Sequence, residues 1–185
     1  MSSVVAGASG LGQTDFELFG LPQRFALDRA DLDARWKTLQ AQVHPDRFAS
    51  ADAQSQRQAM QWSVRVNEAY QRLKDPLKRA AYLCEMRGAP IQAENNTAMP
   101  AAFLMQQMQW RESLEEAVEM AELDALQREV ESARSSLLQQ CEQLLDEAGQ
   151  PAQAASQVRA LMFIERFAHD IEQRYEQMEL ATGRT

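Results

Sequence analysis

The 185-residue chain has little of what metal centres, disulfides and membrane spans require. Its two cysteines, Cys84 and Cys141, are far apart in the sequence, and its only histidines are His44 and His169. These spacings match no usual zinc or iron site, so we expect no bound metal and no cofactor. Both cysteines have apolar neighbours at helical spacing, which predicts small buried side chains in a reduced, cytoplasmic protein. No apolar run approaches the roughly 18 residues of a membrane span.

Positive charge is also scarce, and the net charge is −8. Residues 13–76 carry nine basic and nine acidic side chains, whereas residues 77–185 carry ten and eighteen. An acidic second part without a basic stripe argues against nucleic acid and anionic membranes as partners. Residues 1–12 contain no charged side chain, which fits neither a secretory signal nor a mitochondrial presequence. We interpret them as a flexible tail.

Glycine is rare, with seven residues, and no segment alternates polar and apolar residues. The strong helix formers Ala, Leu, Gln, Glu, Arg and Met dominate, so the prediction is an all-α fold. Asp28 is a candidate cap for a helix that ends near Val43, because Pro45 disfavours helical dihedrals at the preceding residue. Ser50 or Asp52 then begins a longer helix. Further on, Asp75-Pro76 indicates a cap followed by a first-turn proline.

The second part of the chain has clear stop signals at its ends and a weak one inside. Gly88 and Pro90 end a helix, and the polar segment 89–100 is predicted to be a linker. Residues 101–148 contain neither Gly nor Pro and could form a rod of roughly 70 Å, so we expect a turn near Val118–Asp124. A second turn is predicted at 149–151. Three antiparallel helices over 101–183 follow, a bundle whose seam alternates spacings of three and four.

The predicted loop between the first two long helices carries His44-Pro45-Asp46. A His–Asp pair suggests acid–base chemistry, but no second histidine and no serine or cysteine elbow accompanies it, so we expect no catalytic residues and no enzyme. The tripeptide between two amphipathic helices, with Tyr70 and Asp75-Pro76 beyond it, resembles the J-domain of co-chaperones that stimulate DnaK-type ATPases. That resemblance implies a helical hairpin over 13–88 that displays the tripeptide at its tip.

The resemblance also implies which residues bind the chaperone. Pro45 stiffens the loop and Asp46 can accept charge-assisted hydrogen bonds from a partner arginine. Basic residues off the apolar stripe could steer an acidic surface. The predicted chaperone-binding set is His44, Pro45, Asp46, Arg35, Lys37 and Arg47. The chain departs from the common pattern at Val43, where J-domains usually have Tyr.

The helix from Ala101 has more apolar residues than one core stripe needs. Phe103, Trp110 and Leu114 suffice for the core, and additional apolar residues lie on a neighbouring face with an acidic rim, as in a docking patch. On the last helix, two phenylalanines are also predicted to lie off the core stripe. The surplus apolar residues are Leu104, Met105 and Met108, the rim residues are Gln109, Glu112 and Glu116, and the two phenylalanines are Phe163 and Phe167.

Three segments carry a wider resemblance: Phe16-Glu17-Leu18-Phe19-Gly20-Leu21-Pro22, His44-Pro45-Asp46-Arg47-Phe48 and Phe103-Leu104-Met105. Through them, nearly the whole chain resembles the HscB type of J-protein. The resemblance implies delivery of the iron–sulfur scaffold IscU to the chaperone HscA and stimulation of its ATPase. It assigns scaffold binding to Leu104, Met105, Met108, Glu112, Glu116 and Phe163, with Gln109 where an acidic residue is common. We expect a monomer. The alternative is a J-domain co-chaperone for another client, with the bundle used for dimerisation.

Overall fold

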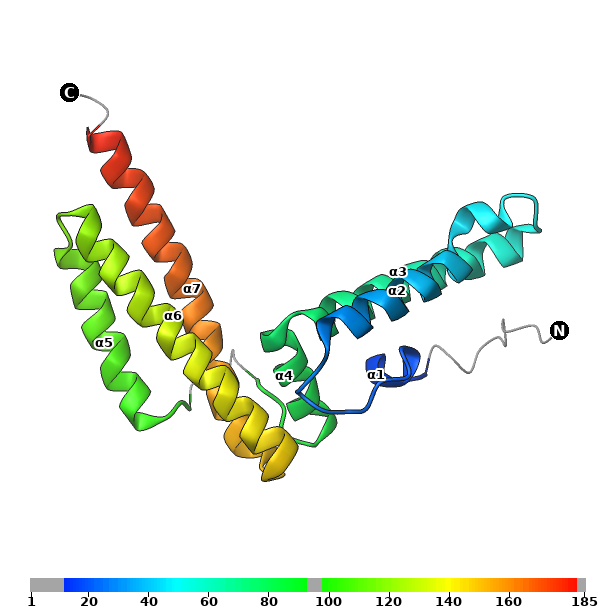
Figure 1. Cartoon of the computed structure of the whole chain (residues 1–185), viewed down its shortest axis with the longest axis horizontal. Helices are drawn as coiled ribbons and strands as arrows, with labels where there is room; N and C mark the ends of the chain where they lie inside the picture. Colours follow the sequence, from blue (N-terminus) through cyan, green and yellow to red (C-terminus); the bar gives the residue numbers. More distant parts are fainter. Residues whose placement is uncertain (1–11, 93–97, 183–185) are drawn as a thin grey trace. The chain divides into compact units, whose positions relative to one another are not determined.

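The computed structural model describes residues 12–92 and 98–182, and every regular element in these ranges is a helix (Figure 1). The prediction of an all-α chain is therefore confirmed. The predicted tail lies outside the described residues, apart from Gly12. The chain divides into two compact units, Met1–Tyr82 and Leu83–Thr185.

The first unit is built around a hairpin of two long helices. It contains α1 (Asp15–Leu18), α2 (Arg29–Val43), the 3₁₀ turn η1 (Pro45–Phe48), α3 (Ala53–Lys74) and the beginning of α4 (Pro76–Met86). Helices α2 and α3 lie side by side, with η1 at the end of the hairpin (Figure 1). Between them the rings of Trp36 and Tyr70 stack with centroids 4.6 Å apart, and the Trp36 indole N–H donates to Asn67.

Short acidic side chains start these helices, as the sequence predicts. The carboxylate of Asp28 accepts two backbone N–H groups at the start of α2. Asp52, rather than Ser50, does the same for α3. Asp75 caps α4, whose first residue is Pro76. These caps satisfy backbone donors that have no partner inside the helix.

The second unit contains the predicted three antiparallel helices. They are α5 (Ala101–Glu116), α6 (Met120–Glu142), which continues into the π-helical turn η2 (Gln143–Glu147), and α7 (Pro151–Thr182). The turn between α5 and α6 falls at residues 117–119, at the beginning of the range predicted for it. A reciprocal cap between Glu119 and Glu122 begins α6 there. The Glu122 carboxylate accepts the N–H groups of Val118 and Glu119, and these hydrogen bonds lower its pKa.

Each unit has its own apolar core. In the first unit, large side chains from α1, α2, α3 and α4 are buried, and in the second unit they come from α4, α5, α6 and α7. The largest fully buried side chains are Phe16, Leu32, Val66, Leu73, Leu83, Trp110, Leu123, Val158, Leu161, Ile164, Phe167 and Ile171. Burial at roughly 25 cal/mol per Å² of apolar surface is the main force that holds such helices together.

The division between the units falls inside α4, six residues before the predicted end of the first domain at 88. Leu83 and Cys84 are fully buried and belong to the second unit. The Arg87 guanidinium donates to the carbonyl of Leu145 in η2, so the end of α4 is tied to the second unit. Gly88 then ends the helix with φ +79°, a conformation that glycine adopts without steric cost.

The predicted linker 89–100 is anchored on both sides of its undescribed residues 93–97. Arg159 of α7 is buried and donates to the carbonyls of Ala98, at 2.6 Å, and Ile91, at 3.2 Å. The side chain of Ile91 is also buried. The described ends of the linker therefore belong to the second unit rather than forming a free tether.

Candidate partner-binding surfaces

The tripeptide lies at the tip of the α2–α3 hairpin, where the sequence predicts it. Helix α2 ends at Val43, and His44 leaves helical geometry with φ −59° and ψ 129°. The backbone then forms η1 and turns into α3. The Asp46 side chain is 90% exposed, so its carboxylate is available to a partner.

Side chains of the loop and of α3 hold this turn. Nδ1 of His44 accepts the backbone N–H of Asp46 at 3.3 Å and lies 3.6 Å from its carboxylate. The Gln56 amide donates to the carbonyls of Ala49 and Ala51 and ties the end of the turn to α3. Because the turn is fixed from within, docking would cost less conformational entropy.

The basic residues predicted to contact the chaperone have different surroundings. Arg35 donates from Nε to Asp31 at 2.8 Å and from Nη1 to the carbonyls of Phe19 and Gly20. It therefore connects the end of α1 to α2. Lys37 is exposed on α2 and makes no hydrogen bond or ion pair within the described part of the chain. The Arg47 guanidinium donates to a carbonyl in the last turn of α2.

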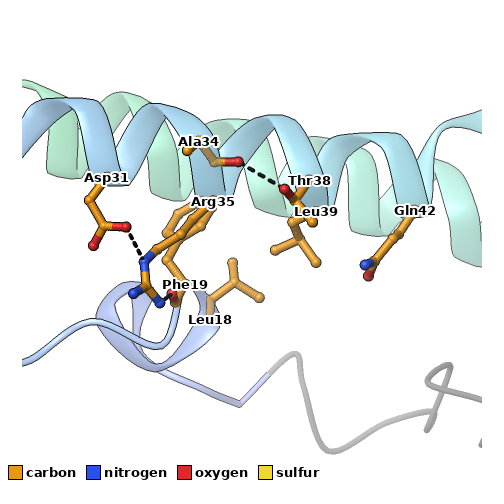
Figure 2. Close-up of a pocket in the computed structure, with 8 residues that line it drawn as sticks. All are labelled: Leu18, Phe19, Asp31, Ala34, Arg35, Thr38, Leu39 and Gln42. Atoms are coloured by element: carbon orange, nitrogen blue, oxygen red, sulfur yellow. Dashed lines mark hydrogen bonds and ion pairs between the residues drawn. The ribbon is translucent and has the colours of Figure 1, made fainter.

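An open hollow of about 380 Å³ lies between α1 and α2 (Figure 2). One end contains the Asp31–Arg35 pair, Leu39 of α2 and Leu18 of α1 lie on opposite sides of the middle, and Gln42 lies at the far end. The sequence pattern did not indicate this hollow. Arg35 points across it toward Phe19, so its charge is used partly inside the unit.

Helix α5 divides as the sequence predicts into a buried and an exposed face. Phe103 and Trp110 are buried, whereas Leu114, also predicted to be in the core, is only half-buried. Leu104, Met105 and Met108 are 47%, 68% and 74% exposed. The rim residues Gln109, Glu112 and Glu116 are also exposed. We call Leu104, Met105 and Met108 the methionine patch.

The prediction that Phe163 and Phe167 lie off the core is wrong. Phe163 is 7% exposed, stacks on Phe167 at 5.7 Å and meets the ring of Phe103 edge-on at 5.8 Å. The reason is that α7 packs against both α5 and α6, so it buries a face wider than one stripe. The guanidinium of Arg111, a residue of α5, lies over the Phe163 ring, so Phe163 lies behind α5.

An ion-pair cluster that the sequence analysis missed supports the first unit. Asp15 is fully buried, and its two carboxylate oxygens lie 2.7 Å from Arg65 and 2.7 Å from Arg72 of α3. Its backbone N–H donates to the hydroxyl of Tyr82, whose ring stacks on Phe16. The only signal available in the sequence was an acidic residue at the start of a short helix, and it does not name its distant partners.

The two cysteines are buried free thiols, as predicted. Burial raises the pKa of Cys84 to about 11 and that of Cys141 to about 12, so both are protonated near neutral pH. Within residues 12–92 and 98–182, no group of three or more His, Cys, Asp or Glu side chains could hold a metal ion. No helix in the same ranges is long and apolar enough to cross a membrane.

Comparison with known proteins gives concordant matches. Residues 99–172 match the family model described as the HSCB C-terminal oligomerisation domain. The chain is 52% identical over 172 residues to a co-chaperone protein HscB homolog of Burkholderia thailandensis, covering 91% of this chain and 98% of that protein. It is 51% identical over 157 residues to the homolog from Bordetella pertussis, covering 84% and 92%.

Solved structures agree. The chaperone HscB from Vibrio cholerae matches with a TM-score of 0.77 and 36% identity, over 90% of this chain and 99% of that one. The human co-chaperone protein HscB matches with a TM-score of 0.83 over 89% and 83%, and at 24% identity it supports the fold alone.

Proposed function

Since the chain belongs to the HscB family of co-chaperones, we propose that it stimulates the ATPase of an HscA-type chaperone and delivers an IscU-type scaffold to it. In this role the protein is an adaptor in cytoplasmic iron–sulfur cluster assembly with no enzymatic activity of its own. The observation that carries the proposal is an exposed carboxylate, that of Asp46, on a turn held from within at the tip of a helical hairpin.

The chaperone side of the proposal rests on charge and preorganisation. The Asp46 carboxylate can accept charge-assisted hydrogen bonds from an arginine of the partner. Lys37 is exposed on the preceding helix and can steer an acidic surface toward the loop. Arg35 contributes mainly by holding α1 against α2.

The scaffold side rests on the methionine patch. Exposed apolar side chains that share one face attract a partner because their burial releases water. Methionine suits such a surface, since its flexible thioether adapts to the partner. The acidic rim residues Glu112 and Glu116 favour a partner surface with basic side chains around an apolar centre. Phe163 supports this face from behind α5.

Steady-state ATP turnover by the chaperone tests the first half of the proposal. Asp46→Asn keeps the shape of the side chain and the backbone N–H that His44 accepts, but removes the charge. We expect it to abolish stimulation while scaffold binding is unchanged. Glu68→Gln, an exposed acid of α3, is the matched control. Normal stimulation by Asp46→Asn would refute the chaperone-docking role.

Isothermal titration with the scaffold tests the second half. Changing Leu104, Met105 and Met108 together to Ser should weaken binding by at least about tenfold, because a small apolar centre usually carries most of the binding energy. Phe163 is left intact, since its burial would turn a binding test into a stability test. Val118→Ser with Leu180→Ser removes exposed apolar side chains elsewhere on the same unit and should leave scaffold binding unchanged.

A second function keeps the co-chaperone role but changes the client. The description of the matching family model as an oligomerisation domain favours a bundle used for self-association. Light scattering separates the two proposals, since the scaffold adaptor is expected to be a monomer. The second function would be favoured if the protein is a dimer and if its stimulation of the ATPase does not increase in the presence of IscU.

A further inference from the structure

The end of α2 has a carbonyl that the tripeptide itself leaves without a donor. In an α-helix the carbonyl of one residue accepts the N–H of the fourth residue after it. For Ala41 that residue is Pro45, which has no N–H. Nη1 of Arg47 lies 3.2 Å from the Ala41 carbonyl oxygen and supplies the missing donor.

Arg47 also holds the other side of the turn. Its backbone N–H donates to the carbonyl of His44 at 3.1 Å. Residues 44–46 are therefore enclosed between two hydrogen bonds from Arg47, one from its backbone and one from its side chain. The third constraint is the hydrogen bond from the Asp46 N–H to the His44 imidazole.

We infer that Arg47 is a positioning residue, which fixes the turn that presents Asp46, and not a charge that contacts the chaperone directly. The inference rests on the proposed function, since it concerns the same loop. Nη1 of Arg47, an exposed residue, reaches back to a carbonyl of α2, whereas the Asp46 carboxylate is directed to solvent. Lys37 is exposed, makes no hydrogen bond or ion pair among the described residues and interacts with Asp33 only through space, so it provides the contrast of a steering charge.

The first test needs no chaperone. Backbone amide signals and hydrogen exchange in the full chain are compared for the wild type, Arg47→Met, Arg47→Lys and Lys37→Met. We expect Arg47→Met to shift the amide signals of His44 and Asp46 and to speed their exchange. Arg47→Lys keeps a donor and should restore most of the wild-type pattern, and Lys37→Met should leave it unchanged. Wild-type amides in Arg47→Met would overturn the inference.

The second test is the salt dependence of ATPase stimulation. Loss of the Arg47 side-chain hydrogen bond should raise the concentration for half-maximal stimulation by about fivefold, and this increase should persist at high salt. The defect of Lys37→Met should disappear at high salt, because screening removes long-range steering. An Arg47→Met defect that also disappears at high salt would identify a steering charge and refute positioning. Absence of stimulation by the wild type would refute the proposed function, and the amide test would still decide the role of Arg47.

Discussion

Replacing Asp15 by Asn should loosen α1 from α3 and destabilise the first unit. The carboxylate is fully buried and pairs with Arg65 and Arg72, both at 2.7 Å. Asn has nearly the same shape, so the change removes the charge without leaving a cavity. The guanidinium groups of Arg65 and Arg72 would then have one neutral amide oxygen in place of the carboxylate.

The magnitude follows from which arginine can reach water. Removing one partner of a buried ion pair costs about 3–5 kcal/mol when the other charge stays buried. The side chain of Arg65 is 19% exposed, and that of Arg72 is 43% exposed. The contribution of the Asp15–Arg72 pair to the free energy of unfolding is therefore reduced to that of a surface pair. The Asn side-chain oxygen also still accepts one hydrogen bond. We expect a loss of about 2–3 kcal/mol in the free energy of unfolding of the first unit.

Hydrogen exchange followed by mass spectrometry measures this loss in each unit separately. Exchange should accelerate in α1 and α3 and remain at wild-type rates in α6 and α7. Asp31→Asn is the control, because its pair with Arg35 is exposed and should contribute less than about 1 kcal/mol. If Asp15→Asn cost no more than Asp31→Asn, the buried cluster would not be what holds α1 in place.

Three further predictions follow from local geometry. Cys84 and Cys141 are buried thiols with raised pKa values, so neither should react with an aromatic disulfide reagent until the second unit unfolds. Gly20→Ala should lower the thermal midpoint, with a cost of about 1–2 kcal/mol, because φ is +62° and a Cβ would lie 3.2 Å from Nη1 of Arg35. Ser55 donates its N–H and its hydroxyl to the Asp52 carboxylate, and these hydrogen bonds hold the pKa of Asp52 below its ordinary value of 3.8. The Asp52 cap should therefore persist above pH 3.8 and weaken only as the pH falls through the lower pKa of the folded protein. Amide exchange at the start of α3 checks this.

Local signals in the sequence were sufficient for the helices and for the position of the tripeptide. Asp28 and Asp52 act as caps because a short acidic side chain can reach the free N–H groups of the first turn. The exposed face of α5 also followed from counting apolar residues against one core stripe, which correctly separated Met105 from Trp110. These features depend on neighbours within about one or two turns of helix, which the sequence displays directly.

Features that depend on distant neighbours were missed or wrongly predicted. A single apolar stripe predicts Phe163 outside the core, whereas α7 packs on two helices and buries it. The partners of Asp15 lie 50 and 57 residues away, and no periodicity connects them. The turn before α6 lacks Gly and Pro, but the reciprocal cap of Glu119 and Glu122 is a local signal that could have fixed its position.

Arginine serves this fold in a way that charge counting alone does not reveal. Helix C-termini leave carbonyl oxygens without intrahelical donors, and the helix dipole makes that end negative. At the ends of several helices an arginine from elsewhere in the chain supplies the donor. These contacts join Arg35 to Phe19 and Gly20 after α1, Arg47 to Ala41 in α2, Arg79 to Leu73 in α3, Arg174 to Ala117 after α5 and Arg87 to Leu145 in η2.

This use of arginine changes how the basic residues near the tripeptide are interpreted. An arginine whose N–H groups donate to carbonyls retains its charge but has fewer donors for a partner, whereas a lysine with no hydrogen bond among the described residues keeps all three. Among the basic residues predicted to face the chaperone, Arg35 uses both Nε and Nη1 within the first unit, Arg47 uses only Nη1, and Lys37 makes no hydrogen bond among the described residues. The net charge of the hairpin therefore overstates its capacity for direct contacts. Because the charge of Arg35 is paired with Asp31 at 2.8 Å, whereas Lys37 has no ion pair among the described residues, the salt dependence of stimulation should follow Lys37 more closely than Arg35.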